Sequence, residues 1–327
     1  MDHSIQHIND VMALTQKDMD KVNQHLTQQL NSEVILINQI AAYIINNGGK
    51  RLRPVLMVLI SEALNYKGTQ HINLAAVIEL IHTATLLHDD VVDESAMRRG
   101  EKTSHEIWGN SASVLVGDFL YSKSFQMMIQ ANSMEVMQIL SDATNKISEG
   151  EVQQLLNIGN IDISETNYFQ IIANKTAKLF EAACELAAVI AAEDQTMKNT
   201  LGQFGMYLGT AFQIADDVLD YTADDESLGK NLGDDFKEGK LTLPLIYILK
   251  NGDEKSKTQI TEAIKSPSST DFVAVKNMVK QSEAINYTLQ QAKELSNKAK
   301  AAISLLPDST AKKALVFLCD YAWKRTV

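Results

Sequence analysis

Apolar residues recur at intervals of three and four positions along most of the chain, which is the spacing of amphipathic α-helices. The segments VMALTQKDMDKVNQHL and VILINQIAAYII follow this pattern. Two further segments, LAAVIELIHTATLLH and GMYLGTAFQIADDVLDY, are apolar around most of the helix circumference, so we expect them to be central helices. Hairpin turns of the Asn-Gly or Asp-Gly type between alternating valine, isoleucine or threonine runs are not found. The pattern therefore predicts an all-α protein.

Clusters of glycine, proline and polar residues interrupt the helical pattern along the chain. They are residues 46–54, 65–70, 98–104, 157–164, 224–240, 250–255 and 265–270. None has the composition of a long flexible linker, so we expect a single domain over residues 1–327, with roughly a dozen helices around a central cavity. Residues 1–30 are expected to form an N-terminal helical segment, and the more polar residues 251–327 an outer helical layer.

Composition narrows the class of protein. Hydrophobic residues make up 45% of the chain and charged residues 22%, as in soluble globular proteins. The formal net charge of −11 argues against nucleic acid as a partner. We find no secretory signal and no apolar run of the ~18 residues that a membrane span requires, so we expect a cytoplasmic protein. Cys184 and Cys319 lack metal-ligand spacing and are expected to be buried and reduced.

Two acidic clusters lie in otherwise apolar helical segments, LLHDDVVD and QIADDVLD. Aspartates four positions apart share a helix face, and they repel each other unless a cation binds between them. The apolar flanks leave little polar face, which argues against a solvated acidic surface. Hard oxygen ligands without an EF-hand loop favour Mg²⁺, so two such clusters facing one cavity are expected to hold a diphosphate through the metal. The clusters consist of Asp89, Asp90 and Asp93, and of Asp216, Asp217 and Asp220.

Basic residues next to glycines provide the positive charge that a diphosphate site also needs. They lie in GGKRLRP, MRRG, NKTAKLF and GKNLGDDFKEGKLTLP. Taken one at a time, each is more simply explained as a surface charge, but their combination with the acidic helices indicates phosphate binding. The candidates are Lys50, Arg51, Arg53, Arg98, Arg99, Lys175, Lys230, Lys237 and Lys240.

Five motifs follow one another along the chain: GGKRLRP, LLHDDVVDESAMRRG, GEVQQL, KTAKLFEAA and FQIADDVLDY…GKNLGDDFKEGKLTLP. In the order and spacing of these motifs, the chain resembles the trans-prenyltransferases, the head-to-tail polyprenyl diphosphate synthases. The resemblance extends over about residues 30–327. Within the family, AVIELIHTATLLHDD and GNSASVLVGDFLYSKSFQMM most resemble bacterial octaprenyl diphosphate synthases, which make quinone side chains. The resemblance implies the isoprenoid synthase fold, Mg²⁺ as cofactor, and condensation of isopentenyl diphosphate onto an allylic diphosphate such as farnesyl diphosphate.

Roles carried over by position from this family follow the motifs. The implied direct metal ligands are Asp89, Asp93 and Asp216, with Asp90, Asp217 and Asp220 as further or water-mediated partners. The implied ligands of the allylic diphosphate are Arg98, Lys175, Lys230 and Lys240, and those of isopentenyl diphosphate are Lys50, Arg53, His82 and Arg99. Thr176 and Gln213 resemble the residues that turn oxygen dipoles toward the allylic carbocation.

Product length is expected to depend on the residues one turn before the first aspartate motif. Relatives with short products carry a bulky aromatic residue there, whereas this chain has the small Ala84 and Thr85. Phe125 or Met128, in SVLVGDFLYSKSFQMMI, is expected to form the floor of the product tunnel. Such apolar helix residues are more often plain core, and this alternative stays open.

Two other functions fit parts of the sequence. A terpene cyclase shares the first aspartate motif but usually carries an Asn/Ser/Glu metal triad in place of the second. A non-catalytic regulatory subunit of a heteromeric prenyl synthase tends to lose aspartates or basic residues that this chain retains. The family also implies a homodimer, with the apolar helices of residues 110–140 as a candidate interface, and peripheral membrane contact for product release.

Overall fold

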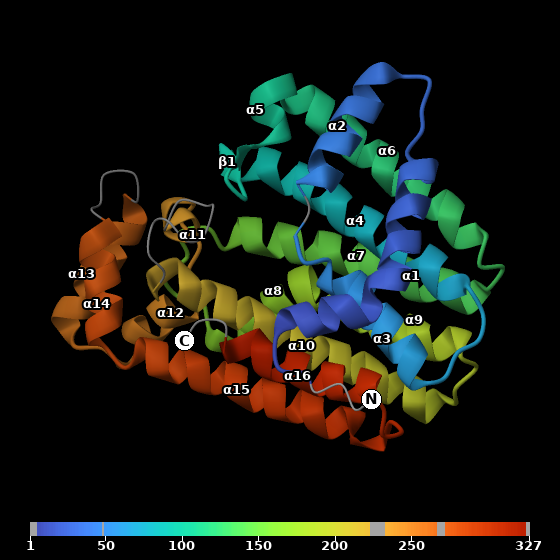
Figure 1. The fold of residues 1–327 in the computed structure, drawn as a ribbon. Coiled ribbons are helices and arrows are strands. Elements are labelled where there is room, and N and C mark those ends of the chain that lie inside the picture. Colours follow the sequence, from blue (N-terminus) through green and yellow to red (C-terminus); the bar gives the residue numbers. More distant parts are fainter. Residues whose placement is uncertain (1–4, 48, 223–232, 267–271, 325–327) are drawn as a thin grey trace. The chain divides into compact units, whose positions relative to one another are not determined.

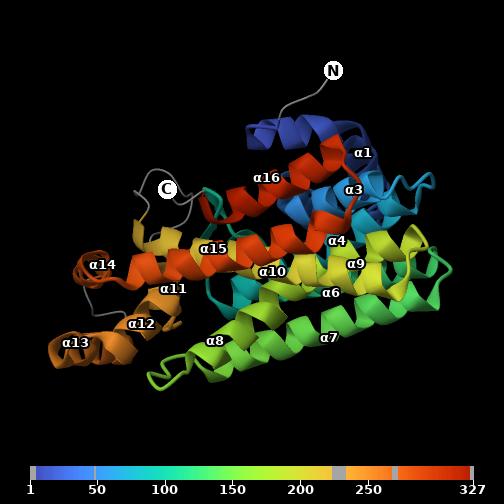
Figure 2. The ribbon, with the colours of Figure 1, turned by 90° about the horizontal axis from the view of Figure 1, so that it is seen from below.

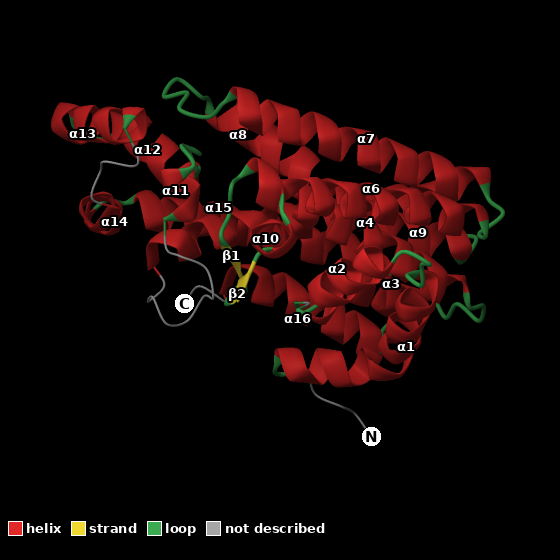
Figure 3. Cartoon of the chain, turned by 90° about the horizontal axis from the view of Figure 1, so that it is seen from above, coloured by secondary structure: helices red, strands yellow, loops and turns green. Residues whose placement is uncertain are grey.

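The computed structural model describes residues 5–47, 49–222, 233–266 and 272–324. This part of the chain is almost entirely helical (Figures 1 and 3), so the all-α prediction is confirmed. Two compact units are distinguished, each built from several segments. Unit 1 comprises residues 1–144, 179–205 and 302–318, and unit 2 comprises residues 145–178, 206–301 and 319–327. The expectation of a single domain stays a prediction.

Helix α4 forms the centre of unit 1. It packs against α1, α3, α5 and α6, and α4 and α6 run alongside each other (Figures 1 and 2). Residues 74–78 of α4 are fully buried, as we expected for a helix that is apolar around most of its circumference. The helices of this unit are α1 (Ile8–Gln29), α2 (Ile35–Asn46), α3 (Leu52–Ala63), α4 (Gln70–Val92), α5 (Ser104–Trp108) and α6 (Asn110–Ile129).

A short hairpin follows α4, where the sequence indicated only a break. Its strands are β1 (Met97–Arg98) and β2 (Glu101–Lys102), paired antiparallel. Arg99 and Gly100 both have positive φ, 55° and 82°, as the two central residues of a type I′ turn do. Strands of two residues are too short to give an alternating pattern, which is why the sequence did not predict them.

Five longer helices contribute residues to both units. The second expected central helix, α10, is buried at Phe204 in unit 1 and at Ala211 and Val218 in unit 2, and its central position stays a prediction. At Gly205 a Cβ would come within 2.4 Å of the Phe180 carbonyl oxygen, so glycine allows α9 and α10 to approach closely in unit 1. The five are α7 (Met134–Leu156), α9 (Lys178–Ile190), α10 (Gln195–Thr222), α15 (Ala284–Ala302) and α16 (Thr310–Lys324); the short 3-10 helix η3 (Ile303–Leu305) follows α15.

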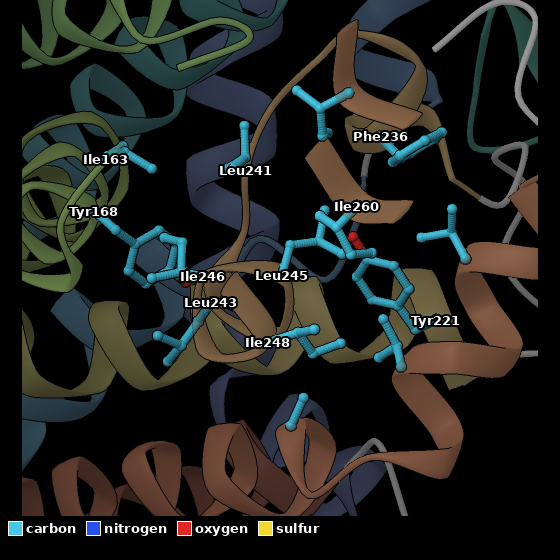
Figure 4. Packing of buried hydrophobic residues seen from close by; sticks show 14 of the residues in the cluster. Ile163, Tyr168, Tyr221, Phe236, Leu241, Leu243, Leu245, Ile246, Ile248 and Ile260 are labelled. Atoms are coloured by element: carbon cyan, nitrogen blue, oxygen red, sulfur yellow. The ribbon is translucent and has the colours of Figure 1, made fainter. Parts of the chain in front are cut away.

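Unit 2 has its own hydrophobic core, shown in Figure 4. Tyr221 and Phe236 are both fully buried, and their rings lie 5.9 and 5.7 Å from the ring of Phe272. Ile246 and Ile248 of α12 belong to the same cluster. The remaining elements of this unit are α8 (Glu165–Ile172), the π-helical turn η1 (Ala173–Ala177), α11 (Asp234–Lys237), α12 (Leu243–Asn251), α13 (Glu254–Lys265) and α14 (Phe272–Gln281).

Both cysteines are buried thiols that do not take part in a disulfide, as the sequence indicated. Burial raises the pKa of the Cys319 thiol to about 12, so this group stays protonated and unreactive at neutral pH.

Within the described residues, no helix combines the length and the apolar composition needed to cross a membrane.

Candidate active site

The first aspartate motif lies at the C-terminal end of α4. Asp89 and Asp90 belong to the last turn, and Asp93 caps the helix by donating its backbone N–H to the carbonyl oxygen of Asp89 at 2.8 Å. A helix carries partial negative charge at this end, so three carboxylates here are repelled by one another and by the helix dipole. Because local structure disfavours this arrangement, the motif indicates that cations offset the charge.

Arg98 is the cation that pairs with Asp90. Its Nε and Nη2 lie 2.7 and 2.6 Å from the same oxygen of Asp90. Asp90 is fully buried, whereas Asp89 and Asp93 are partly exposed. The motif therefore contains one internal carboxylate held by the protein and two outer carboxylates, four residues apart, that solutes can reach.

The segments GGKRLRP and MRRG meet in unit 1. Arg99 donates from Nη1 to the carbonyl oxygen of Asn47 at 3.1 Å, across 52 positions of sequence. A Cβ on Gly49 would lie 2.7 Å from Nη2 of Arg99, so the glycine leaves room for this guanidinium. We call Lys50, Arg51, Arg53, Arg98 and Arg99 the basic cluster.

Side chains of α3 and α4 order this basic cluster. Arg51 begins α3 in the left-handed conformation, with φ 47°, and donates from Nη2 to the Ile45 carbonyl oxygen at 3.1 Å. Its Nε lies 3.7 Å from Oε1 of Glu79, which is 8% exposed. The guanidinium of Arg53 lies 4.4 Å above the ring of Phe180, a cation–π contact. Lys50 is exposed in the same loop.

Burial and charge shift two pKa values beside the basic cluster. Burial raises the pKa of Glu79, and Arg51, Arg53 and Arg99 oppose this effect. Burial, followed by repulsion from Arg53, Arg99 and Arg98, holds the pKa of His82 well below its ordinary value of 6.5. At neutral pH His82 is therefore a neutral imidazole among cations.

The second aspartate motif occupies the last two described turns of α10 and repeats the division seen in the first. Asp216 is exposed and Asp220 partly so, with an oxygen of Asp220 accepting the Gly233 backbone N–H at 2.8 Å. Asp217 is only 2% exposed; it accepts Nε2 of Gln213 at 2.9 Å on one oxygen and the Tyr168 hydroxyl on the other. Burial, and then the charge of Asp235, raises the pKa of Asp217 well above its ordinary value.

The outer carboxylates of both motifs suit Mg²⁺. Each motif offers hard oxygen donors on one helix face, and Mg²⁺ usually binds one or two carboxylates and completes its shell with water and phosphate oxygens. In the ranges that the structure describes, no three or more histidine, cysteine or carboxylate side chains are grouped to hold a metal on their own. The fit of Mg²⁺ thus rests on the donor type and on the accessibility of Asp89, Asp93 and Asp216.

A π-helical turn, η1, presents Lys175 and Thr176. Gly150 of α7 makes room for it, because a Cβ there would lie 2.6 Å from the Lys175 backbone nitrogen. Lys175 Nζ contacts Oε2 of Glu151 at 2.7 Å and Oε1 of Gln154 at 2.6 Å. These contacts place the GEVQQL motif beside the lysine, and π turns of this kind are frequent at functional sites.

Two further candidate phosphate-binding residues, Lys237 and Lys240, follow the second aspartate motif in the sequence and belong to unit 2. Lys240 is 8% exposed and its Nζ lies 2.6 Å from Oε2 of Glu238. Lys237, in α11, pairs with Asp234 at 3.6 Å and is more exposed. Lys230 lies outside the described residues.

The four predicted chain-length residues all belong to unit 1. Ala84 is fully buried in α4, and Thr85 donates from its hydroxyl to the carbonyl oxygen of His82 at 2.8 Å. On α6, Met128 is fully buried, whereas the Phe125 side chain is 37% exposed and packs against Tyr121. Of the two candidates for a tunnel floor, Met128 therefore has the more enclosed position.

The chain is similar to known proteins over nearly its whole length. The polyprenyl synthetase family model matches residues 34–282. The octaprenyl diphosphate synthase of Escherichia coli K12 is 47% identical over 316 residues, and that of Haemophilus influenzae 46% identical over 312 residues. The Escherichia coli alignment covers 96% of this chain and 98% of the relative, and the Haemophilus influenzae alignment covers 95% of each. The chain belongs to the polyprenyl synthetase family.

A solved structure supports the fold of this polyprenyl synthetase. The polyprenyl synthase of Caulobacter crescentus CB15, crystallised with calcium and isoprenyl diphosphate, matches it with a TM-score of 0.95 and 41% identity over 98% of each chain. The expected isoprenoid synthase fold and family are thereby confirmed. This polyprenyl synthetase is a prenyltransferase of the long-chain trans-polyprenyl diphosphate synthase type.

The structure adds residues of this polyprenyl synthetase that sequence reasoning did not select. Tyr168 gave no signal, because a single aromatic residue in an amphipathic helix is ordinary core. Glu79 did give one, since it is a charged residue in the apolar run AVIELIH. Glu151 and Gln154 lay in a quoted motif without an assigned role, and their contact with Lys175 now supplies one.

Proposed function

We propose that this polyprenyl synthetase adds isopentenyl diphosphate repeatedly to a farnesyl diphosphate primer and makes octaprenyl diphosphate, a precursor of quinone side chains. The observation that carries this proposal is the identity of 46–47%, over nearly the full length, to two octaprenyl diphosphate synthases. The outer carboxylates of the two aspartate motifs and the basic cluster provide the groups that such a reaction needs.

Metal binding is assigned to the outer carboxylates. Asp89, Asp93 and Asp216 would hold Mg²⁺, which supplies Lewis-acid stabilisation of the leaving diphosphate when bound. Calcium in the Caulobacter crescentus relative supports the use of a divalent cation. Asp90 and Asp217 are less suited as ligands, because Asp90 is fully buried and pairs with Arg98 through one oxygen, and both oxygens of Asp217 accept hydrogen bonds, from Gln213 and Tyr168. That the two motifs serve the same diphosphate stays a prediction from the sequence.

Cationic side chains are assigned to the two diphosphates. Arg98, Lys175, Lys230 and Lys240 would bind the allylic diphosphate, while Lys50, Arg53, His82 and Arg99 would bind isopentenyl diphosphate. In the described structure Glu151 pairs with Lys175 and Glu238 pairs with Lys240, so two of these cations are held by a neighbouring carboxylate. A neutral His82 can donate one hydrogen bond to a phosphate oxygen while its pKa stays low.

The reaction begins when the allylic C–O bond breaks and its electron pair leaves with the diphosphate. Thr176 and Gln213, joined by a 3.0 Å hydrogen bond, present oxygen dipoles that stabilise the carbocation. The double bond of isopentenyl diphosphate then attacks the cation, and the departing diphosphate accepts the proton that is lost. The chain is longer by one isoprene unit, and the small Ala84 and Thr85 leave room for it to grow.

Assembly and location belong to the same proposal. Large apolar side chains are exposed at Leu115 and Ile129 of α6 and at Met134 of α7, by 65%, 63% and 79%. Exposed apolar side chains of this kind suit an interface between two copies of the chain, which supports a homodimer. We place the enzyme in the cytoplasm, with peripheral membrane contact when the lipid product leaves.

One assay tests the proposal against its alternatives. The protein alone is incubated with farnesyl diphosphate, labelled isopentenyl diphosphate and Mg²⁺, and products are sized by reversed-phase chromatography. We expect a linear product of eight isoprene units. A cyclic hydrocarbon would indicate a terpene cyclase, no turnover until a second chain is added would indicate a regulatory subunit, and a linear product of another length would correct the product alone.

A further inference from the structure

Thr176 uses its hydroxyl proton differently from threonines in the regular helices of this chain. A helical threonine commonly donates its hydroxyl proton to the carbonyl one turn earlier. Thr83, Thr210 and Thr288 do so, to Glu79, Met206 and Ala284, at 2.7–2.8 Å. Thr176 lies in the π turn η1 and donates instead to Oε1 of Gln213 at 3.0 Å. Its oxygen lone pairs are therefore not used in that bond.

Asp217 determines which way the amide of Gln213 faces. The amide nitrogen can only donate, and it donates to an oxygen of Asp217 at 2.9 Å. The amide oxygen consequently faces Thr176, so the threonine hydroxyl must be the donor of that bond. If the amide were turned over, Thr176 would have to accept, and one of its lone pairs would be lost to Gln213.

Tyr168 fixes Asp217 in turn. Its hydroxyl donates to the second oxygen of Asp217 and crosses 49 positions of sequence. Tyr168 and Asp217 are 4% and 2% exposed, so water does not readily replace either partner. The ring of Tyr168 packs edge-on against Phe169 with centroids 5.4 Å apart, which restricts its own orientation.

We propose that Tyr168 is a positioning residue for carbocation stabilisation, acting through Asp217 and Gln213 so that Thr176 presents its oxygen lone pairs to the cation. The inference rests on the proposed condensation reaction. It concerns a step after the substrates are bound, so the Tyr168 hydroxyl should affect turnover and leave substrate affinity nearly unchanged.

Tyr168→Phe removes the hydroxyl and keeps the ring. We expect kcat to fall about 10-fold, the size of one positioning hydrogen bond, with KM for both substrates within about twofold of the wild type. Tyr287→Phe is the matched control: its hydroxyl donates to Oε1 of Glu165 at 2.6 Å, in the same unit but outside this set of residues, and its loss should leave kcat unchanged. Equal losses in both variants, or a rise in KM without a fall in kcat, would overturn the proposal.

A double-mutant cycle with Gln213→Ala separates positioning from general stability. Once Gln213 is gone, Tyr168 has no amide to orient, so adding Tyr168→Phe should lower kcat by less than about twofold. A further 10-fold loss in that background would show that Tyr168 acts by another route. The wild-type protein is assayed first. If it does not extend farnesyl diphosphate, the proposed function itself is refuted, and this outcome is distinct from any difference between the variants.

Asp217→Asn covers the case in which Tyr168→Phe does not fold. It should lower kcat about 10-fold while the Mg²⁺ concentration for half-maximal rate stays within about twofold, because both oxygens of Asp217 bind protein groups. A Mg²⁺ requirement raised about 10-fold or more would make Asp217 a metal ligand and overturn the proposal.

Discussion

Arg98 donates from Nε to one oxygen of the buried Asp90 carboxylate at 2.7 Å, and its Nη2 lies 2.6 Å from the same oxygen. The pair joins the aspartate-rich end of α4 to the hairpin that follows it. Removing one partner of a buried ion pair leaves the other charge without compensation, and this costs more than the pair itself contributes. Arg98 is therefore needed for stability as well as for any role in phosphate binding.

Arg98→Met should lower the free energy of unfolding by about 3 kcal/mol, measured by urea denaturation, because Asp90 then stays buried without its cation. Glu101→Gln, an exposed change on β2 of the same hairpin, should alter it by less than about 0.5 kcal/mol. If the two variants were equally stable, the ion pair would have no structural importance.

Asp89→Asn and Asp216→Asn should each lower kcat about 100-fold, because each removes an oxygen donor for the metal that stabilises the leaving diphosphate. Both variants should also need more Mg²⁺ for half-maximal rate, and urea unfolding of each variant distinguishes lost metal binding from lost folded protein. Asp142→Asn, which changes an exposed carboxylate on α7, serves as the control. A similar loss of rate in this control would remove the assignment of metal binding to the two motifs.

The free energy of unfolding should fall as the pH drops below 6.5, the ordinary pKa of histidine, because of His82. Its pKa in the folded protein lies well below 6.5, so between 6.5 and that lower value the unfolded chain binds a proton that the folded chain does not. Wild-type protein should thus lose up to about 1.4 kcal/mol per pH unit more than His82→Gln in this range. The measurement is urea unfolding of both proteins from pH 7.5 down to about pH 5.5. Parallel curves would mean that His82 titrates normally.

Ala84→Phe should shorten the products, because the aromatic ring would obstruct the growing chain beside α4. Ala76→Phe is the matched control, since Ala76 is also a fully buried alanine of α4, about two turns earlier. Overpacking at Ala76 should cost about 1–3 kcal/mol of stability without changing the product length. Chromatographic sizing of the products of both variants, alongside thermal unfolding, makes the comparison. An unchanged product in Ala84→Phe would exclude this residue from length control.

The local sequence was sufficient to predict most helices and to place the two aspartate motifs on helices. The break predicted at 46–54 is wider than the gap between α2, which ends at Asn46, and α3, which begins at Leu52; Pro54 lies in the first turn of α3, where a proline is tolerated. The β1–β2 hairpin was not predicted, since its strands are only two residues long. Arg51 was singled out as a basic residue, but its contact with Glu79 depends on packing between α3 and α4.

By itself, the sequence determined the helical class, the family and the two sets of three aspartates, because periodicity and motif spacing are properties of neighbouring residues. It could not distinguish the members of each adjacent aspartate pair. Tertiary structure made Asp90 and Asp217 internal and left Asp89 and Asp216 accessible, through partners 8 and 49 positions away. The physical reason is that the protonation, burial and pairing of a carboxylate depend on what packs against it, and only the folded chain brings Arg98 and Tyr168 to these positions.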